Sequence, residues 1–212
     1  LSAAAVGRCI DAVGIGFLFA PSHHPAMRHA AQPRREIGIR TVFNVLGPLT
    51  NPAGASRQLM GVFDGSLCAT LASALATLGA ERAMVVYGLD GLDEVSTVGP
   101  TIVSEVRDGV VETTTITPQD LGLPAATRED LRGGRTPVES AAVLRAVLGG
   151  EPGPRRDVVA ANAAAGLIVG GMARDWRDGC ATASGILESG AAARVLDQLI
   201  AYTKECEDEH PL

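Results

Sequence analysis

The sequence predicts an α/β fold built on a mixed, mainly parallel sheet that is covered by helices. Two apolar runs of strand length enclose an Ala- and Leu-rich helical segment between residues 58 and 87. Strand, helix and strand in this order, with both strands apolar throughout, are typical of a βαβ unit in a parallel sheet. An Asp-Gly dipeptide between two β-branched runs indicates an antiparallel hairpin further along, and the last third of the chain has helical periodicity.

The chain begins with a predicted helix over residues 1–13, which ends at Gly14 because glycine readily adopts the left-handed conformation that follows a helix. The apolar run of residues 15–20 has the length and composition of a buried strand. Gly-Pro and Asn-Pro dipeptides in residues 41–52 predict that this segment ends irregularly.

The βαβ unit is predicted to consist of a strand at residues 58–63, a helix at 67–78 and a strand at 82–87. The hairpin strands follow at residues 101–107 and 110–117. Four helices are predicted after the hairpin, at residues 138–148, 156–169, 176–188 and 191–202. We expect residues 1–203 to form one α/β domain that is incomplete at its N-terminus, and the charged residues 204–212 to form a frayed tail.

Composition excludes several classes of protein. The 212 residues are 46% hydrophobic, which excludes intrinsic disorder, and no uncharged apolar stretch reaches the length of about 18 residues that a membrane span needs. The net charge of −6 argues against binding to nucleic acid or anionic membranes. Four scattered cysteines without metal-site spacing, and no signal peptide, favour reduced thiols in the cytoplasm.

Three carboxylates, Asp90, Asp93 and Glu94, follow the second strand of the βαβ unit within five residues. Ligands of open α/β sheets bind at the carboxyl ends of strands. Crowded carboxylates repel one another unless a cation lies between them, and Mg²⁺ is commonly held by one or two carboxylates with substrate phosphates and waters. The alternative is an ordinary acidic turn, in which Asp and Gly serve the turn geometry.

Residues 23–52 combine arginines and histidines with proline breakers. Arginine binds carboxylate or phosphate through two parallel hydrogen bonds, so Arg34, Arg35 and Arg40 suggest an anionic small molecule. The alternative for each arginine is a solvated helix face or an ion pair with Glu36. The adjacent histidines, His23 and His24, have no obvious third metal ligand, and we interpret them as pocket-lining or structural.

Asn162 lies in an Ala-rich helix and is interpreted as a hydrogen-bonding residue of the core rather than a catalyst. Dinucleotide-binding, P-loop and serine-hydrolase motifs are not found in the sequence.

Three motifs together resemble the anthranilate phosphoribosyltransferase family, in the same order and at similar separations. They are RTVFNVLGPLTNP from Arg40, QLMGVF from Gln58 and VVYGLDGLDEVS from Val85. The resemblance implies a phosphoribosyltransferase-like α/β fold. It also implies a reaction of tryptophan biosynthesis, in which the amino group of anthranilate attacks C1 of phosphoribosyl pyrophosphate and displaces pyrophosphate.

The resemblance also implies roles for individual residues. Asp93 and Glu94 match the acidic pair that binds Mg²⁺ on the pyrophosphate side. Arg34 matches the arginine that binds the anthranilate carboxylate; Arg35 is the alternative, and the spacing to Arg40 favours Arg34. His24 and Pro48 match residues that line the anthranilate channel.

Some family features are not found in this sequence. The family carries a Gly-Thr-Gly-Gly-Asp loop for phosphoribosyl pyrophosphate, a Lys-His-Gly-Asn segment, and a small helical domain through which the full-length protein is expected to form a homodimer. The only lysine here is Lys204, so we expect part of the active site to lie outside this chain.

Three alternatives remain open at this point. A pyrimidine-nucleoside phosphorylase would share the fold, but its lysine- and serine-based phosphate site cannot be located in this sequence. A non-catalytic relative that binds nucleic acid would need a basic face, which the net charge of −6 disfavours. The third is an inactive truncated product.

Overall fold

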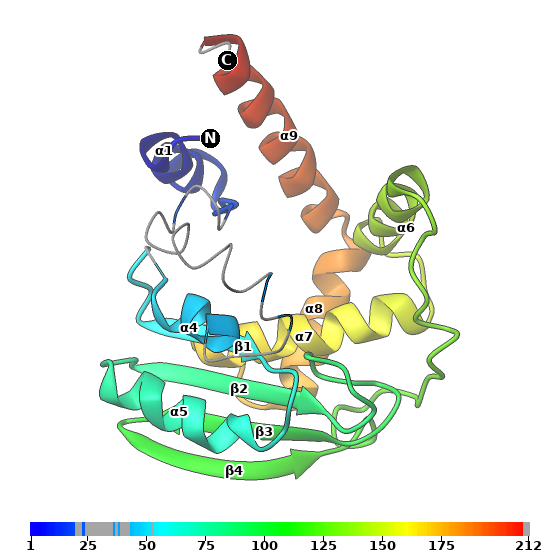
Figure 1. Cartoon of the computed structure of the whole chain (residues 1–212). Coiled ribbons are helices and arrows are strands. Elements are labelled where there is room, and N and C mark those ends of the chain that lie inside the picture. The colour runs from blue at the N-terminus through cyan, green and yellow to red at the C-terminus, as the bar shows by residue number, and fades with distance from the viewer. Residues whose placement is uncertain (20–22, 24–35, 37, 39–42, 52, 210–212) are drawn as a thin grey trace. The chain divides into compact units, whose positions relative to one another are not determined.

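The computed structural model describes residues 1–19, 23, 36, 38, 43–51 and 53–209 (Figure 1). Backbone contacts divide the chain into two compact units. The first comprises residues 1–54 and 192–212, and the second comprises residues 55–191. The single domain expected over residues 1–203 stays a prediction.

The second unit is built on a sheet of four strands, in the order β1 (Arg57–Gly61), β2 (Arg82–Gly88), β3 (Thr101–Arg107) and β4 (Val110–Ile116). Strands β1 and β2 are parallel and are connected through α5 (Leu67–Thr77), which confirms the predicted βαβ unit. The pairs β2–β3 and β3–β4 are antiparallel. The sheet is therefore mixed, as predicted, but the expectation that it is mainly parallel was wrong: among the described residues only the β1–β2 pair is parallel, because the Asp-Gly hairpin and the return from β2 to β3 reverse the chain direction (Figure 1).

The hairpin between β3 and β4 turns at Asp108 and Gly109. Their φ angles are 51° and 76°, the left-handed conformation that both central residues of a type I′ turn require. Arg107 pairs with Val110 directly across this turn. The Asp-Gly dipeptide thus sets the register of the hairpin, as the sequence predicted.

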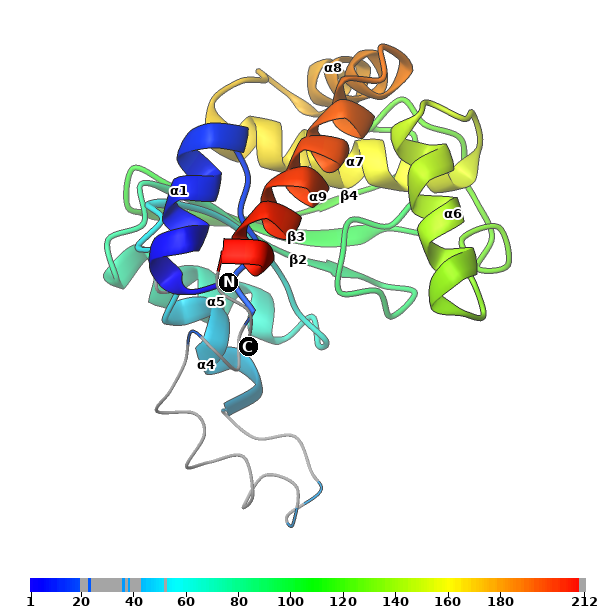
Figure 2. The same ribbon diagram turned by 90° about the horizontal axis from the view of Figure 1, so that it is seen from above.

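Three helices complete the second unit: α6 (Pro137–Leu148), α7 (Pro154–Gly170) and α8 (Trp176–Glu188). Helix α7 contacts β1 and β2, whereas α5 contacts β2, β3 and β4. Seen from above, α7 runs over the sheet (Figure 2). Because α5 and α7 both pack on β2, this strand is buried from Ala83 to Val86, which explains its apolar sequence.

The main core lies where α7 covers the sheet. Alanines dominate the buried face of α7. Branched residues of β2, β3 and the loop between them fill the remaining space. The core includes Met84, Val86, Val95, Val103, Ala161, Ala164, Ala165 and Ile168.

The first unit contains α1 (Ala3–Val13), α4 (Phe43–Leu49) and most of α9 (Ala191–Glu209). The Ser2 hydroxyl accepts a hydrogen bond from the Ala5 N–H at the start of α1, and Gly14 ends the helix with φ 88°. The first predicted helix and its terminating glycine are therefore confirmed.

Two expectations for this unit were wrong. Residues 15–19 do not form a strand: no strand pairs with them among the described residues, and Phe17 and Phe19 remain 72% and 56% exposed. An apolar run becomes a strand only when another strand accepts its backbone hydrogen bonds. At the other end of the chain, residues 204–209 continue α9 instead of beginning a frayed tail.

All four cysteines are free of disulfide bonds, in agreement with the reduced thiols that their spacing predicted. Burial raises the pKa of the Cys180 thiol to about 11, and the negative charge of Asp157 adds to this effect. Across the described part of the chain, no helix combines the length and apolarity that crossing a membrane requires.

Candidate functional site

The loop between β2 and β3, residues 89–100, carries the three predicted carboxylates, and we call it the acid loop. It begins where β2 ends, at the carboxyl end of the parallel pair. Its two ends are joined by a hydrogen bond of 2.8 Å from the Leu89 N–H to the Pro100 carbonyl oxygen. A second bond of 2.8 Å, from the Gly88 N–H to the Leu92 carbonyl oxygen, folds its first half back on β2. The predicted position of the carboxylates at the end of this strand is therefore correct.

Asp93 and Glu94 form the outer part of the acid loop. Both residues are exposed, and neither carboxylate has a hydrogen bond or an ion pair with another described residue. Carboxylate oxygens are the ligands that Mg²⁺ prefers, and a site that takes phosphates and waters needs only one or two of them from the protein. The donor set of Asp93 and Glu94 therefore fits a magnesium ion that also binds a phosphorylated ligand.

Asp90 lies in a different environment from the other two acids. Both of its carboxylate oxygens are buried without a hydrogen-bond partner. The side chain lines a cavity of about 240 Å³ together with Gly91, Leu92, Val98, Arg128 and Leu131. Among the described residues, no three His, Cys, Asp or Glu side chains come together as a metal site, so the three acids do not converge on one cation.

The buried carboxylate of Asp90 supports a stability prediction. Burying a carboxylate without a hydrogen-bond partner costs more than burying a neutral amide of the same size, so Asp90→Asn is expected to raise the free energy of unfolding by about 1 kcal/mol at pH 7. Urea denaturation would measure the change. The exposed Asp93→Asn is the matched control, and its effect is expected to stay within about 0.5 kcal/mol. A stability loss in Asp90→Asn would contradict the prediction.

The inner part of the acid loop is an anchor that follows directly on the two outer acids. Val95, Ser96 and Thr97 are at most 1% exposed. The Ser96 N–H donates to the Thr101 hydroxyl at 2.9 Å, and the Ala126 N–H donates to the Thr97 carbonyl oxygen at 2.8 Å. The two exposed carboxylates, which have no described partner, are therefore followed directly by a buried stretch of backbone.

Asn162 of α7 holds this anchor at Val95. The Val95 N–H donates to Oδ1 of Asn162 at 2.9 Å, and Nδ2 of Asn162 donates to the Val95 carbonyl oxygen at 2.9 Å. The sequence interpretation of Asn162 as a hydrogen-bonding residue agrees with this geometry. Its partner, the backbone of the acid loop, could not be anticipated because 67 residues separate the two positions.

Gly61, the last residue of β1, is a functional position that the sequence interpretation missed. A Cβ on this residue would overlap the carbonyl oxygen of Asp93, so the acid loop passes directly over the end of β1. Only a residue without a side chain leaves space for that backbone. The available signal was the glycine in QLMGVF, since an isolated glycine in a strand often marks a close backbone approach.

Arg128 lies beside the acid loop, and a Cβ on Gly91 would lie 3.7 Å from its Nη2 atom. The turn that carries Arg128 is closed by hydrogen bonds of 2.8 Å and 2.6 Å from the Thr127 N–H and hydroxyl to the Asp130 carboxylate. The hydroxyl bond, followed by the backbone bond, lowers the pKa of Asp130 below its usual value. A positive charge is therefore held by a closed turn beside Gly91, at the cavity that Asp90 also lines.

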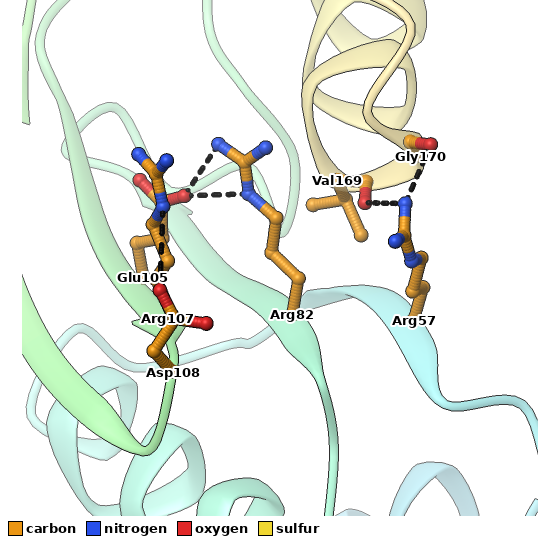
Figure 3. Close-up of polar contacts among 7 residues, drawn as sticks. All are labelled: Arg57, Arg82, Glu105, Arg107, Asp108, Val169 and Gly170. Carbon is orange, nitrogen blue, oxygen red and sulfur yellow. Dashed lines mark hydrogen bonds and ion pairs between the residues drawn. The ribbon is translucent and has the colours of Figure 1, made fainter.

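The arginines at the opposite end of β1 and β2 have structural roles instead. Arg57 at the start of β1 donates through Nη1 to the carbonyl oxygens of Gly170 at 2.7 Å and Val169 at 3.5 Å, where α7 ends (Figure 3). Arg82 pairs with Glu105 at 2.8 Å across β2 and β3. A cation at the C-terminus of a helix is favourable, so Arg57 fixes α7 to the sheet.

Of the residues predicted to contact anthranilate, the structure describes only one. Arg34 and His24 lie outside the described residues, as do the alternatives Arg35 and Arg40. Pro48 lies in α4, is exposed, and belongs to the first unit, whereas Asp93 and Glu94 belong to the second. The roles of Arg34, His24 and Pro48 therefore stay predictions.

Comparisons with known proteins agree on one family. The sequence model of the glycosyl transferase family, a/b domain, matches residues 1–193. An anthranilate phosphoribosyltransferase of Symbiobacterium thermophilum is 53% identical over 204 residues, which are 96% of this chain and 60% of the relative. A relative of the same name from Moorella thermoacetica is 52% identical, over 94% of this chain and 59% of its own length. The chain thus spans about 60% of the length of these relatives.

Solved structures give the same result. The anthranilate phosphoribosyltransferase (TrpD) of Thermus thermophilus superposes with a TM-score of 0.87 at 45% identity, covering 94% of this chain and 59% of that one. The Saccharomyces cerevisiae enzyme in complex with PRPP and Mg superposes with a TM-score of 0.86 at 30% identity, covering 97% and 59%. The fold of the present chain is therefore shared with proteins of that name.

Proposed function

Since the chain belongs to the glycosyl transferase family, a/b domain, we propose that it is part of an anthranilate phosphoribosyltransferase of tryptophan biosynthesis. Such an enzyme transfers the phosphoribosyl group of phosphoribosyl pyrophosphate to anthranilate, giving N-(5-phosphoribosyl)anthranilate and pyrophosphate. The observation that carries the proposal is the exposed, unpartnered pair Asp93 and Glu94 at the carboxyl end of β2. The names of the similar proteins favour this function over a nucleoside phosphorylase or a nucleic-acid-binding relative.

Mg²⁺ is part of the proposal, with Asp93 and Glu94 as the residues that would hold it. Support comes from their oxygen donors, which are free of other described partners, and from the yeast relative that was solved in complex with PRPP and Mg. Bound there, the ion would supply positive charge where negative charge develops on departing pyrophosphate. The acid loop contributes a fixed backbone below the two carboxylates.

The reaction exchanges one bond at C1 of the ribose for another. The N–C1 bond forms as the bond from C1 to the pyrophosphate oxygen breaks, and the amine loses a proton. Because the transition state is expected to resemble an oxocarbenium ion, catalysis depends mainly on holding the two substrates in line and on stabilising the leaving group. The residues of this chain are thus proposed to bind and orient rather than to form covalent intermediates.

The proposed anthranilate site uses residues of the first unit. Arg34 would bind the substrate carboxylate through two parallel hydrogen bonds, and His24 and Pro48 would line its channel. Support comes from the motif resemblance and from the yeast relative solved with 4-fluoroanthranilate. A homodimer of the full-length protein and a cytoplasmic location belong to the same proposal, the second supported by the four free cysteines.

The activity is tested by phosphoribosyl transfer from phosphoribosyl pyrophosphate to anthranilate, followed as loss of anthranilate fluorescence. We expect Mg²⁺-dependent turnover in a version extended upstream, and none in the 212-residue chain, which spans about 60% of its relatives. Turnover by the 212-residue chain alone would contradict the expectation that part of the site lies outside it. Absence of transfer in both forms would contradict the proposed function.

A further inference from the structure

Asn162 is bonded to the acid loop in a way that only a side-chain amide satisfies. Its Oδ1 accepts the Val95 N–H, and its Nδ2 donates to the Val95 carbonyl oxygen, both at 2.9 Å. Nδ2 also donates to the Val158 carbonyl oxygen at 2.9 Å, one turn earlier in α7. A carboxylate could accept the first bond but donate neither of the others, and an apolar side chain could form none of the three. The chemistry at this position is thus specific to an amide.

Helix α7 provides a rigid base for this side chain. The residues that flank Asn162 on its buried face, Ala161 and Ala165, are completely buried against the core. At its end, α7 is fixed to β1 through the bond of 2.7 Å from Arg57 to the Gly170 carbonyl oxygen (Figure 3). Asn162 therefore connects the backbone of Val95 to a helix that is itself fixed to the sheet.

The bonds at Val95 act together with the close contact at Gly61. On one side of Glu94, the carbonyl of Asp93 lies directly on the end of β1 at Gly61. On the other side, Val95 is completely buried and bonded through both its N–H and its carbonyl to Asn162. The backbone that carries Asp93 and Glu94 is thus fixed on both sides, although the two carboxylates themselves have no described partner.

We propose that Asn162 is a positioning residue for a divalent cation held by Asp93 and Glu94, acting through the backbone of Val95. The inference rests on the proposed function, in which these acids bind the cation. Because no described side-chain bond fixes the two carboxylates, the position of their backbone determines how well they are arranged for one cation. Residues that orient metal ligands through hydrogen bonds commonly change metal affinity 10- to 100-fold when they are lost, as a rough guide.

Mn²⁺ binding, measured by the loss of the free-ion EPR signal and by competition with Mg²⁺, tests this proposal without an activity assay. Asn162→Leu removes all three bonds, and Asn162→Asp keeps only the acceptor for the Val95 N–H. Both variants are expected to raise the Kd for Mn²⁺ about tenfold or more. Ile168→Val is the matched control in α7, because it weakens the same core without a bond to the acid loop, and its Kd is expected to be unchanged.

A second measurement, amide hydrogen exchange, begins with the unmodified protein, and this part of the test does not depend on how the variants fold. Amide hydrogen exchange should be slow at Val95, whose N–H is bonded and buried, and at least about tenfold faster at Val95 in whichever Asn162 variant folds. Fast exchange of Val95 in the wild-type protein would overturn the proposal. So would unchanged Mn²⁺ affinity in folded Asn162 variants of a wild-type protein that binds Mn²⁺. Failure of the wild-type protein to bind Mn²⁺ would instead contradict the metal assignment of the proposed function.

Discussion

The double substitution Asp93→Ala with Glu94→Ala is expected to abolish Mg²⁺-dependent phosphoribosyl transfer and to leave the fold intact. Both side chains are exposed and have no described partner, so their removal leaves no buried group unpaired. The free energy of unfolding should therefore change by less than about 0.5 kcal/mol. Turnover should fall at least about 10³-fold, because charge stabilisation of a leaving group by a metal ion contributes several kcal/mol.

The measurement is anthranilate fluorescence in a Mg²⁺ titration, with the form of the protein that shows turnover. Asp93→Asn and Glu94→Gln, made singly, separate the two ligands while preserving side-chain size. Glu112→Ala is the matched control: it removes an exposed acid from β4, outside the acid loop, and should leave activity unchanged. Wild-type activity in the double variant would show that the metal assignment is wrong.

Gly61→Ala is the single substitution with the largest expected structural effect at the site. The new Cβ would overlap the carbonyl oxygen of Asp93, and a backbone atom cannot rotate away as a side chain can. Either the end of β1 or the acid loop must move. We expect a loss of about 1–3 kcal/mol in the free energy of unfolding, the usual cost of overpacking, together with weaker Mn²⁺ binding.

Gly99→Ala provides the control for this substitution, because it adds the same methyl group elsewhere in the acid loop. A Cβ at Gly99 would meet nothing within 4 Å, so stability and Mn²⁺ affinity should both stay near the wild-type values. Chemical denaturation and EPR titration compare the two variants directly. Equal stability of Gly61→Ala and Gly99→Ala would refute the close approach of β1 to Asp93.

The two experiments distinguish the chemistry of the acids from the support beneath them. Loss of Asp93 and Glu94 should remove activity without a change in stability, whereas Gly61→Ala should reduce both. The difference follows from burial: the carboxylates face solvent, and the backbone that carries them lies against β1 and α7.

Local sequence was sufficient for most of the secondary structure. The βαβ unit, the hairpin at Asp108 and the starts of the helices after it were predicted to within a few residues, because hydrophobic periodicity and turn chemistry act between near neighbours; α9 alone runs well past its predicted end at residue 202, to Glu209. The position of Asp93 and Glu94 at the end of β2 followed from the same information. The strand predicted over residues 15–20 failed because pairing depends on a second strand, which a local pattern does not reveal.

Contacts between residues far apart in the chain determined the burial of the acids, which sequence patterns could not predict. Three neighbouring acids looked equivalent, yet the fold buries the carboxylate oxygens of Asp90 and leaves Asp93 and Glu94 exposed. The backbone below the exposed pair is held by Gly61 and Asn162, which precede and follow it by many residues. Motif and composition thus indicated which groups could bind a cation. Only packing determined which of them face solvent, because burial and backbone contacts depend on how distant segments meet.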